Sequence, residues 1–279
     1  AKTDGTNALL RAMDFDNIDM VRMLLEAGAD PNEGPAQHPS GQPNVVIPGL
    51  HQAARRRCSP EIAELLIAHG ADGKRPYQGH SAYALARMYG NSGVADVLQR
   101  HGQATPLDPV EEALARCADG EVPQGRPLSG LDPKSEAGRA LTRVILWEDP
   151  LDHAKRLVEA GIDPDTTEEM GMPPIHLAGW AGLVAQTEWL LGLEPDFAHV
   201  NDYGGDLVST IIHGSENRLD TDKRDHVACL CLALEAGAPL KAEEVRGAMN
   251  ERVVAFLSAW AEMHPHRIVD ERNVKGVPE

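Results

Sequence analysis

The chain has 279 residues, enough for one long domain or two short ones, and 42% of them are hydrophobic. Aromatic residues make up only 4%, so alanine, leucine, valine and isoleucine must fill the core, which favours thin layers of helices. The formal net charge of −17 excludes a surface that binds nucleic acid through lysine and arginine, and no apolar run reaches the roughly 20 residues that span a bilayer.

The first part of the chain contains three copies of one pattern, an apolar helical stretch closed by a glycine. The copies read MVRMLLEAGADPN at Met20–Asn32, IAELLIAHGADG at Ile62–Gly73 and VADVLQRHGQA at Val94–Ala104. In each, leucines or valines recur at helical spacing, and the glycine suits the left-handed position that ends many helices. A shorter helical stretch precedes each copy and begins near Thr6, Ile47 and His80. The pattern predicts repeated pairs of helices.

Two segments interrupt these pairs. Gly34–Pro48 is rich in proline and glycine, which cannot continue a helix, so we expect a projecting loop there. Leu107–Cys117 predicts a single helix without a partner, and Asp119–Pro133 then breaks the array with further proline and glycine.

The pattern returns in the second part of the chain. It reads HAKRLVEAGIDPD at His153–Asp165 and VACLCLALEAGAP at Val227–Pro239, and a shorter helical stretch begins near Met172. Gly214–Asp225 is a polar insertion, and Glu243–Trp260 predicts a terminal cap. We expect the residues from 263 to 279 to form an extended tail.

The fragments MLLEAGADPN, LHQAA and PPIHLAGWAG resemble the ankyrin repeat. The distance from Gly70 to Gly102 is 32 residues, close to the family's period of about 33. The resemblance implies an all-α solenoid of about seven helix-turn-helix units, some of them degenerate. The expected divisions are three repeats with the 34–48 insertion in 1–104, a half repeat and loop in 105–135, further repeats with the 214–225 insertion and the cap in 136–262, and the tail.

The sequence offers no clear chemistry. The spacing of the four cysteines fits neither a disulfide framework nor a zinc site, and we expect small buried residues in a reducing compartment. His51 and His176 occupy the histidine of the ankyrin motif, which the resemblance implies is hydrogen-bonded across neighbouring turns. The sequence therefore predicts no catalytic residue, no metal and no cofactor.

The ankyrin resemblance implies two sets of positions that contact a partner. The groove positions follow the alanines of the first helix in each repeat, and here they hold Phe15, Arg55, Arg56, Tyr89, Trp147, Trp180 and His213. The turn positions hold Tyr77 and Tyr203. Exposed aromatic residues concentrate at binding hot spots, but the same rings could instead fill gaps between uneven layers. Likewise, Arg55, Arg56 and Arg57 could grip a carboxylate or lie solvated at a helix end.

The leading hypothesis is a non-catalytic, monomeric module that binds a protein or peptide in its groove. Residues 140–279 carry a net charge of −13, so the partner would be basic, not a nucleic acid or a membrane. The composition suits a bacterial cytoplasmic protein, and the resemblance allows a regulator, an inhibitor of the immunity type or an effector delivered to a host. The alternative is an enzyme or small-molecule binder in which the two insertions roof a pocket.

Overall fold

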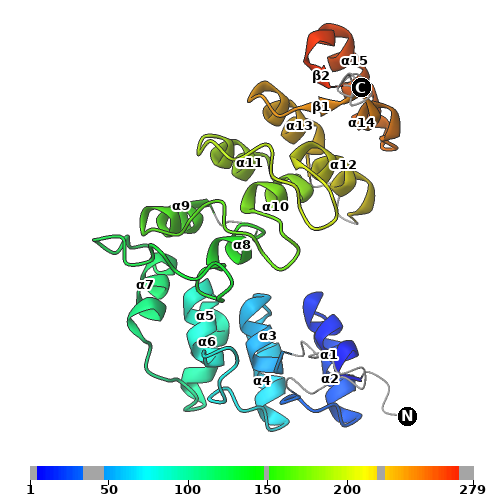
Figure 1. The fold of residues 1–279 in the computed structure, drawn as a ribbon. Helices are drawn as coiled ribbons and strands as arrows, with labels where there is room; N and C mark the ends of the chain where they lie inside the picture. Colours follow the sequence, from blue (N-terminus) through cyan, green and yellow to red (C-terminus); the bar gives the residue numbers. More distant parts are fainter. Residues whose placement is uncertain (1–4, 34–46, 148–150, 219–223, 270–279) are drawn as a thin grey trace, which may run out of the picture. The chain divides into compact units, whose positions relative to one another are not determined.

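The computed structural model describes residues 5–33, 47–147, 151–218 and 224–269, and the chain divides into two compact units. Unit 1 comprises Ala1–Leu131, Ser135–Ala140 and Glu159–Gly161, and unit 2 comprises Asp132–Lys134, Leu141–Val158 and Ile162–Glu279. Figure 1 shows that helices dominate both units. The insertion predicted at 34–48 lies outside the described residues except for its last two positions.

Unit 1 is built from pairs of short antiparallel helices. These are α1 (Gly5–Asp14), α2 (Ile18–Glu26), α3 (Gly49–Arg55), α4 (Pro60–Ala68), α5 (Ala82–Tyr89), α6 (Ser92–Arg100) and the unpaired α7 (Pro109–Ala118). The first helices α1, α3, α5 and α7 contact one another in a row, and the second helices α2, α4 and α6 form a parallel row. Residues 119–139 form turns without a helix, as the proline and glycine content predicts.

Unit 2 repeats this plan. It contains α8 (Ala140–Val144), α9 (Leu151–Glu159), α10 (Pro174–Trp180), α11 (Val184–Leu191), α12 (Leu207–Asn217), α13 (His226–Glu235), β1 (Leu240–Lys241), α14 (Ala242–Gly247), α15 (Glu251–Met263), the 3-10 turn η2 (Pro265–Arg267) and β2 (Ile268–Val269). Helices α10 and α12 lie side by side, as do α11 and α13, and α15 packs on α13. The solenoid architecture of helix pairs is therefore present in both units.

Local sequence explains where the helices begin and end. Asn17, Ser81, Asn91, Asp206 and Asp225 each accept a backbone N–H of the first helical turn with their side chains. The repeated glycines lie just after the second helices with positive φ, as the pattern predicts, at Gly28, Gly70, Gly102, Gly161 and Gly237. These capped ends keep each helix short, so successive pairs can stack.

The core consists mainly of alanine and leucine, as the scarcity of aromatic residues predicts. Ala53, Ala54, Ala84 and Ala86 are buried where the first helices of unit 1 meet, so the backbones of neighbouring helices approach closely. Larger side chains such as Leu66 and Leu98 are buried between the second helices. The aromatic Tyr89 is an exception, and it is discussed below with the site.

The polar insertion predicted at Gly214–Asp225 begins later than expected, because α12 continues through Asn217. Gly214 is helical and packs against the end of α10. A Cβ atom built on it would lie 2.7 Å from the carbonyl carbon of Trp180 and closer still to the carbonyl oxygen. Glycine is therefore used here for close approach of two helices, and residues 219–223 of the insertion lie outside the described residues.

The extended tail predicted from residue 263 is wrong for residues 264–269. Ile268 and Val269 pair in parallel with Leu240 and Lys241 in the two-stranded sheet. Arg267 donates to the carbonyl of Leu234 and lies over the ring of Trp260. Arg267 thus has two partners that the sequence pattern did not reveal: the indole ring of Trp260 and a carbonyl in the last turn of α13.

Candidate functional site

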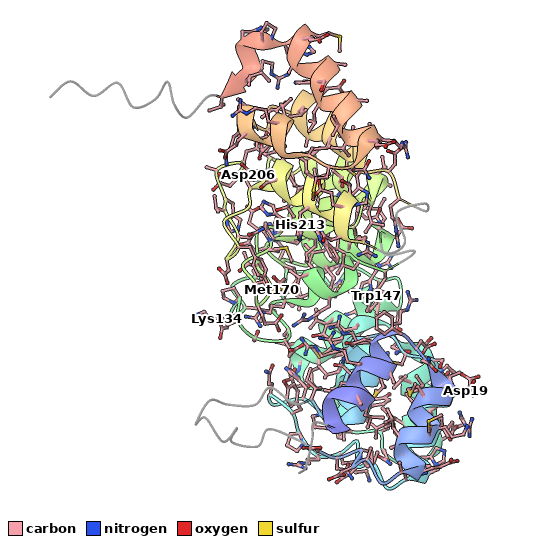
Figure 2. All side chains as sticks on the ribbon, turned by 90° about the vertical axis from the view of Figure 1, so that its right-hand side faces the viewer. Asp19, Lys134, Trp147, Met170, Asp206 and His213 are labelled. Carbon is pink, nitrogen blue, oxygen red and sulfur yellow. The ribbon has the colours of Figure 1, made fainter. Side chains whose placement is uncertain are left out.

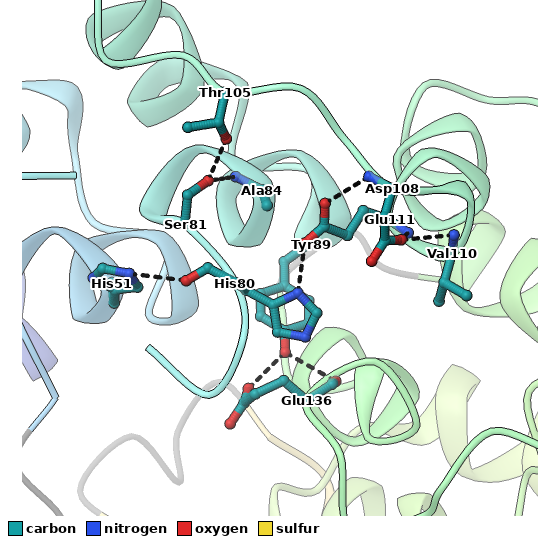
Figure 3. Close-up of polar contacts among 10 residues, drawn as sticks. All are labelled: His51, His80, Ser81, Ala84, Tyr89, Thr105, Asp108, Val110, Glu111 and Glu136. Carbon is teal, nitrogen blue, oxygen red and sulfur yellow. Dashed lines mark hydrogen bonds and ion pairs between the residues drawn. The ribbon is translucent and has the colours of Figure 1, made fainter. Parts of the chain in front are cut away.

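Two groove positions of unit 1, Arg55 and Tyr89, are covered by a segment of the same unit. Glu136, which is 2% exposed, lies between the ends of α3 and α5. Its carboxylate pairs with Arg55 at 3.3 Å and accepts the hydroxyl of Tyr89 at 2.7 Å, as Figure 3 shows for the tyrosine. Arg55 therefore pairs with a carboxylate of its own unit, and this pairing is neither of the two expectations for it.

Burial also removes Tyr89 and Tyr77 from the surface, so the exposure expected for these two rings is wrong. Tyr89 is wholly buried beneath Glu136. Tyr77 exchanges two backbone hydrogen bonds with His80 in a tight turn, and its ring packs edge-on against His51 at 5.8 Å. Both rings fill space between uneven layers, which is the packing alternative for these positions.

The surrounding polar network of unit 1 is structural. His51 Nε2 donates to the carbonyl of His80 at 3.2 Å, which confirms the cross-turn bond predicted for this histidine. Burial lowers the pKa of His51 to about 4, so the ring is neutral near pH 7. His80 Nδ1 lies 2.6 Å from Glu111, whose second oxygen accepts the N–H of Asp108 in a capping box (Figure 3).

Two further groove positions of unit 1 lie at its surface. Arg56 is exposed and pairs with Asp14 at 3.0 Å, and Asp14 also accepts the side-chain amide of Gln52. Phe15 is 74% exposed. The basic spot predicted at Arg55–Arg57 is therefore largely neutralised by carboxylates of the same unit.

The three groove positions of unit 2 are all at least partly accessible. Trp180 ends α10 and is half-buried, with the guanidinium of Arg218 4.6 Å from the centre of its ring. His213 lies on α12 with its side chain exposed, and Trp147 is half-buried beside His153. Figure 2 labels Trp147 and His213 among the side chains of this unit.

The turn position of unit 2 is also accessible. Tyr203 is 77% exposed, and its hydroxyl lies 3.1 Å from the sulfur of Met170 in the preceding turn. Figure 2 labels Met170, which is 39% exposed. Tyr203 and Tyr77 each lie in the turn before a first helix, yet only Tyr203 lies on the surface.

Cys58 and Cys229 are deeply buried. Burial raises the pKa of Cys58 to about 12 and that of Cys229 to about 11, so neither is a thiolate near pH 7. Among the described residues, no group of three or more His, Cys, Asp or Glu side chains could hold a metal ion. Within the same residues, no helix has the length and apolar character needed to cross a membrane.

Sequence reasoning missed Glu136, Met170 and Val200. Glu136 follows the proline- and glycine-rich break, where no repeat motif gives its register, so no local signal could place it against Arg55. Met170 and Val200 are single apolar residues in polar turns, and their exposure depends on how the turns fold. A search for large apolar residues at the turns would have found both.

Comparison with known proteins gives one result. The family model for the ankyrin repeat matches residues 4–34, the part of the chain that contains α1 and α2. No curated protein matches the chain. The helix pair and its closing glycine recur in both units beyond the matched residues.

Proposed function

We propose that this ankyrin-repeat protein is a non-catalytic module that binds a protein or peptide through the groove positions of unit 2. Ankyrin repeats are a general protein–protein interaction module. The finer assignment, to Trp147, Trp180 and His213, rests on accessibility. A partner needs side chains that it can reach, and these three are exposed or half-buried.

The observation that carries the proposal is the contrast between two aromatic groove positions, one in each unit. Tyr89 and Trp180 both lie at the end of a first helix. Tyr89 is wholly buried against Glu136, whereas the indole of Trp180 keeps part of its surface in solvent. Tryptophan beside an arginine is a typical composition of binding hot spots, because it buries a large area at low cost in conformational entropy.

Charge supports the same unit and a basic partner. Residues 140–279 contain 25 acidic and 12 basic side chains, counted along the sequence. This excess would speed the approach of a positively charged protein, so association should slow as the salt concentration rises.

Affinity capture from the source lysate tests the proposal with three baits. They are the wild type, the groove variant Trp180→Ala/His213→Ala, and the control Phe15→Ala, which removes an exposed aromatic from unit 1. Circular dichroism first establishes that all three are folded. We expect a protein that the wild type and Phe15→Ala retain and that the groove variant loses.

Two results would contradict the proposal. If the wild type captures nothing above empty beads, the module has no partner in that lysate. If Phe15→Ala loses the partner and the groove variant keeps it, the contact surface lies on unit 1. In the second case the groove positions of unit 2 would serve packing only.

A further inference from the structure

Two consecutive turns of unit 2, residues 162–173 and 194–206, present a small apolar surface. We call it the turn patch, and it consists of Met170, Val200 and Tyr203, which are 39%, 52% and 77% exposed. The backbone N–H of Asp202 donates to the carbonyl of Met170 at 3.1 Å, which holds the two turns side by side. Three exposed large apolar side chains on adjacent turns are more than the scattered single residues of an ordinary surface.

The turn patch is held rigidly by its own hydrogen bonds. His199 Nε2 lies 2.7 Å from the carbonyl of Gly171, and the side chain of Asn201 accepts the N–H groups of Tyr203 and Gly205. Gly171 has a positive φ, and a Cβ there would lie 2.8 Å from Asp202. The exposed apolar side chains thus stand on a fixed frame, which lowers the entropy that binding would cost.

Carboxylates surround the turn patch. Residues 162–173 and 194–206 contain eight acidic residues and no lysine or arginine. Glu169 pairs with Arg143, and Asp206 pairs with Lys241 of the same unit. Glu168 is buried, so the other carboxylates form the border.

Asp163, Asp165 and Asp196 are exposed, and burial together with the charges of Asp163 and Asp196 raises the pKa of Asp165. His199 lies near both the carboxylates and the turn patch. It interacts electrostatically with Asp165, and its Nε2 atom is hydrogen-bonded to the carbonyl of Gly171, the residue after Met170. The mutual repulsion of these carboxylates would be relieved by a cation.

The corresponding turn of unit 1 lacks both properties. Residues 71–81 contain Lys74 and Arg75, and Arg75 donates to the carbonyl of Asn32 at 3.1 Å. Its aromatic residue, Tyr77, is buried. The combination of exposed apolar side chains and an acidic border is therefore absent from this turn and does not follow from the repeat itself.

We propose that the turn patch binds a protein segment in which one large apolar side chain is flanked by lysine or arginine residues. The apolar side chain would lie on Met170 and Tyr203, and the flanking cations would reach the aspartates of the border. This proposal rests on the proposed function of unit 2 as the binding unit, and it adds the chemistry of the partner.

Fluorescence anisotropy with three synthetic peptides tests the pairing of charge and apolar surface. The first peptide has a central tryptophan flanked by lysines and arginines. The second keeps the tryptophan and replaces every cation with glutamate, and the third keeps the cations and replaces the tryptophan with serine. We expect the first peptide to bind at least tenfold more tightly than either of the others, and its affinity to fall with salt.

Matched variants separate specific binding from general attraction to an acidic protein. Asp163→Asn/Asp196→Asn removes two charges from the border, and the control Asp30→Asn/Asp72→Asn removes two from unit 1. All four aspartates accept the backbone N–H two residues ahead, at 2.8–3.0 Å, a bond that asparagine can retain. We expect the border variant to weaken binding at least fivefold and the control less than twofold.

A second pair of variants tests the apolar surface. Tyr203→Ser should weaken binding at least fivefold, whereas Phe15→Ser, which removes an equally exposed ring from unit 1, should not change it. Equal binding of the first and second peptides would overturn the proposal. Equal effects of Tyr203→Ser and Phe15→Ser, or of the two aspartate variants, would also overturn it.

Failure of the turn-patch proposal can be distinguished from failure of the proposed function. If lysate capture depends on Trp180 and His213 but the peptides fail these tests, unit 2 binds a partner of other chemistry. If the groove variant captures the same lysate proteins as the wild type, and binding of the first peptide still requires Tyr203, the turns alone form the binding surface. Each proposal can thus fail while the other stands.

Discussion

Replacing Gly214 with alanine should destabilise unit 2, because the end of α10 leaves no room for a side chain. The added Cβ would lie 2.7 Å from the carbonyl carbon and 2.8 Å from the Cα atom of Trp180. Both neighbours are backbone atoms, which cannot rotate away as a side chain could. Helix α12 would have to move outward, and the contacts between α10 and α12 would loosen.

The expected cost follows from two opposing effects. Overpacking against fixed atoms costs about 3 kcal/mol at the upper end of the usual range. Alanine in a helix regains about 1 kcal/mol through its higher helix propensity. The variant should therefore lose about 2 kcal/mol of unfolding free energy. The same substitution at Gly247, where nothing lies within 4 Å of the added atom, should be neutral or slightly stabilising.

Urea unfolding followed by tryptophan fluorescence measures this difference in unit 2 alone. All four tryptophans, at positions 147, 180, 189 and 260, belong to unit 2, so the signal is blind to unit 1. The midpoint of Gly214→Ala should fall and that of Gly247→Ala should not. If the unfolding free energies of the two variants lie within 0.5 kcal/mol of each other, the close approach of α12 to Trp180 is refuted.

Two further substitutions test buried carboxyl groups. Burial raises the pKa of Glu244 to about 7, above its unfolded value of 4.5, so its stabilising contribution is complete below pH 4.5 and is lost as the pH rises through 7. The unfolding free energy of Glu244→Gln, relative to that of the wild type, should therefore rise by up to about 2.5 kcal/mol from pH 5 to pH 8 in tryptophan-detected urea unfolding. An equal difference at both pH values would contradict this. In unit 1, Tyr89→Phe leaves the carboxylate of Glu136 without its hydroxyl donor and should cost about 2 kcal/mol by circular dichroism melting. The exposed Tyr203→Phe is its control, and similar costs for both would argue against the buried bond.

The sequence predicted well where the helices of each repeat begin and end, because these positions depend on residues nearby in the chain. A glycine that must take positive φ, and a polar cap before each helix, mark the ends of helices without reference to distant residues. Gly28, Gly70 and Gly161 therefore stand where the pattern put them. The same local reasoning misread Gly214, because glycine followed by serine and asparagine suggests a loop, while contact with Trp180 favours the helix.

Exposure of the site residues could not be predicted, since it depends on what covers them. Tyr89 and Trp180 are both groove positions by motif, but the covering segment that carries Glu136 has no motif of its own. A repeat pattern gives the register of each residue within its own helix pair. It contains no information about an irregular segment that returns from elsewhere in the chain.

Charge and accessibility together point to one unit. In unit 1, Arg55 pairs with Glu136 and Arg56 with Asp14, so cations that could have met an acidic partner are already bound within the unit. In unit 2, Glu169 and Asp206 of the two turns pair with Arg143 and Lys241. Asp163, Asp165 and Asp196 remain exposed. A protein surface with fixed carboxylates and exposed apolar side chains is most complementary to a partner that supplies cations and an apolar anchor. If such a partner binds, mutations in unit 1 should change its affinity only by unfolding that unit.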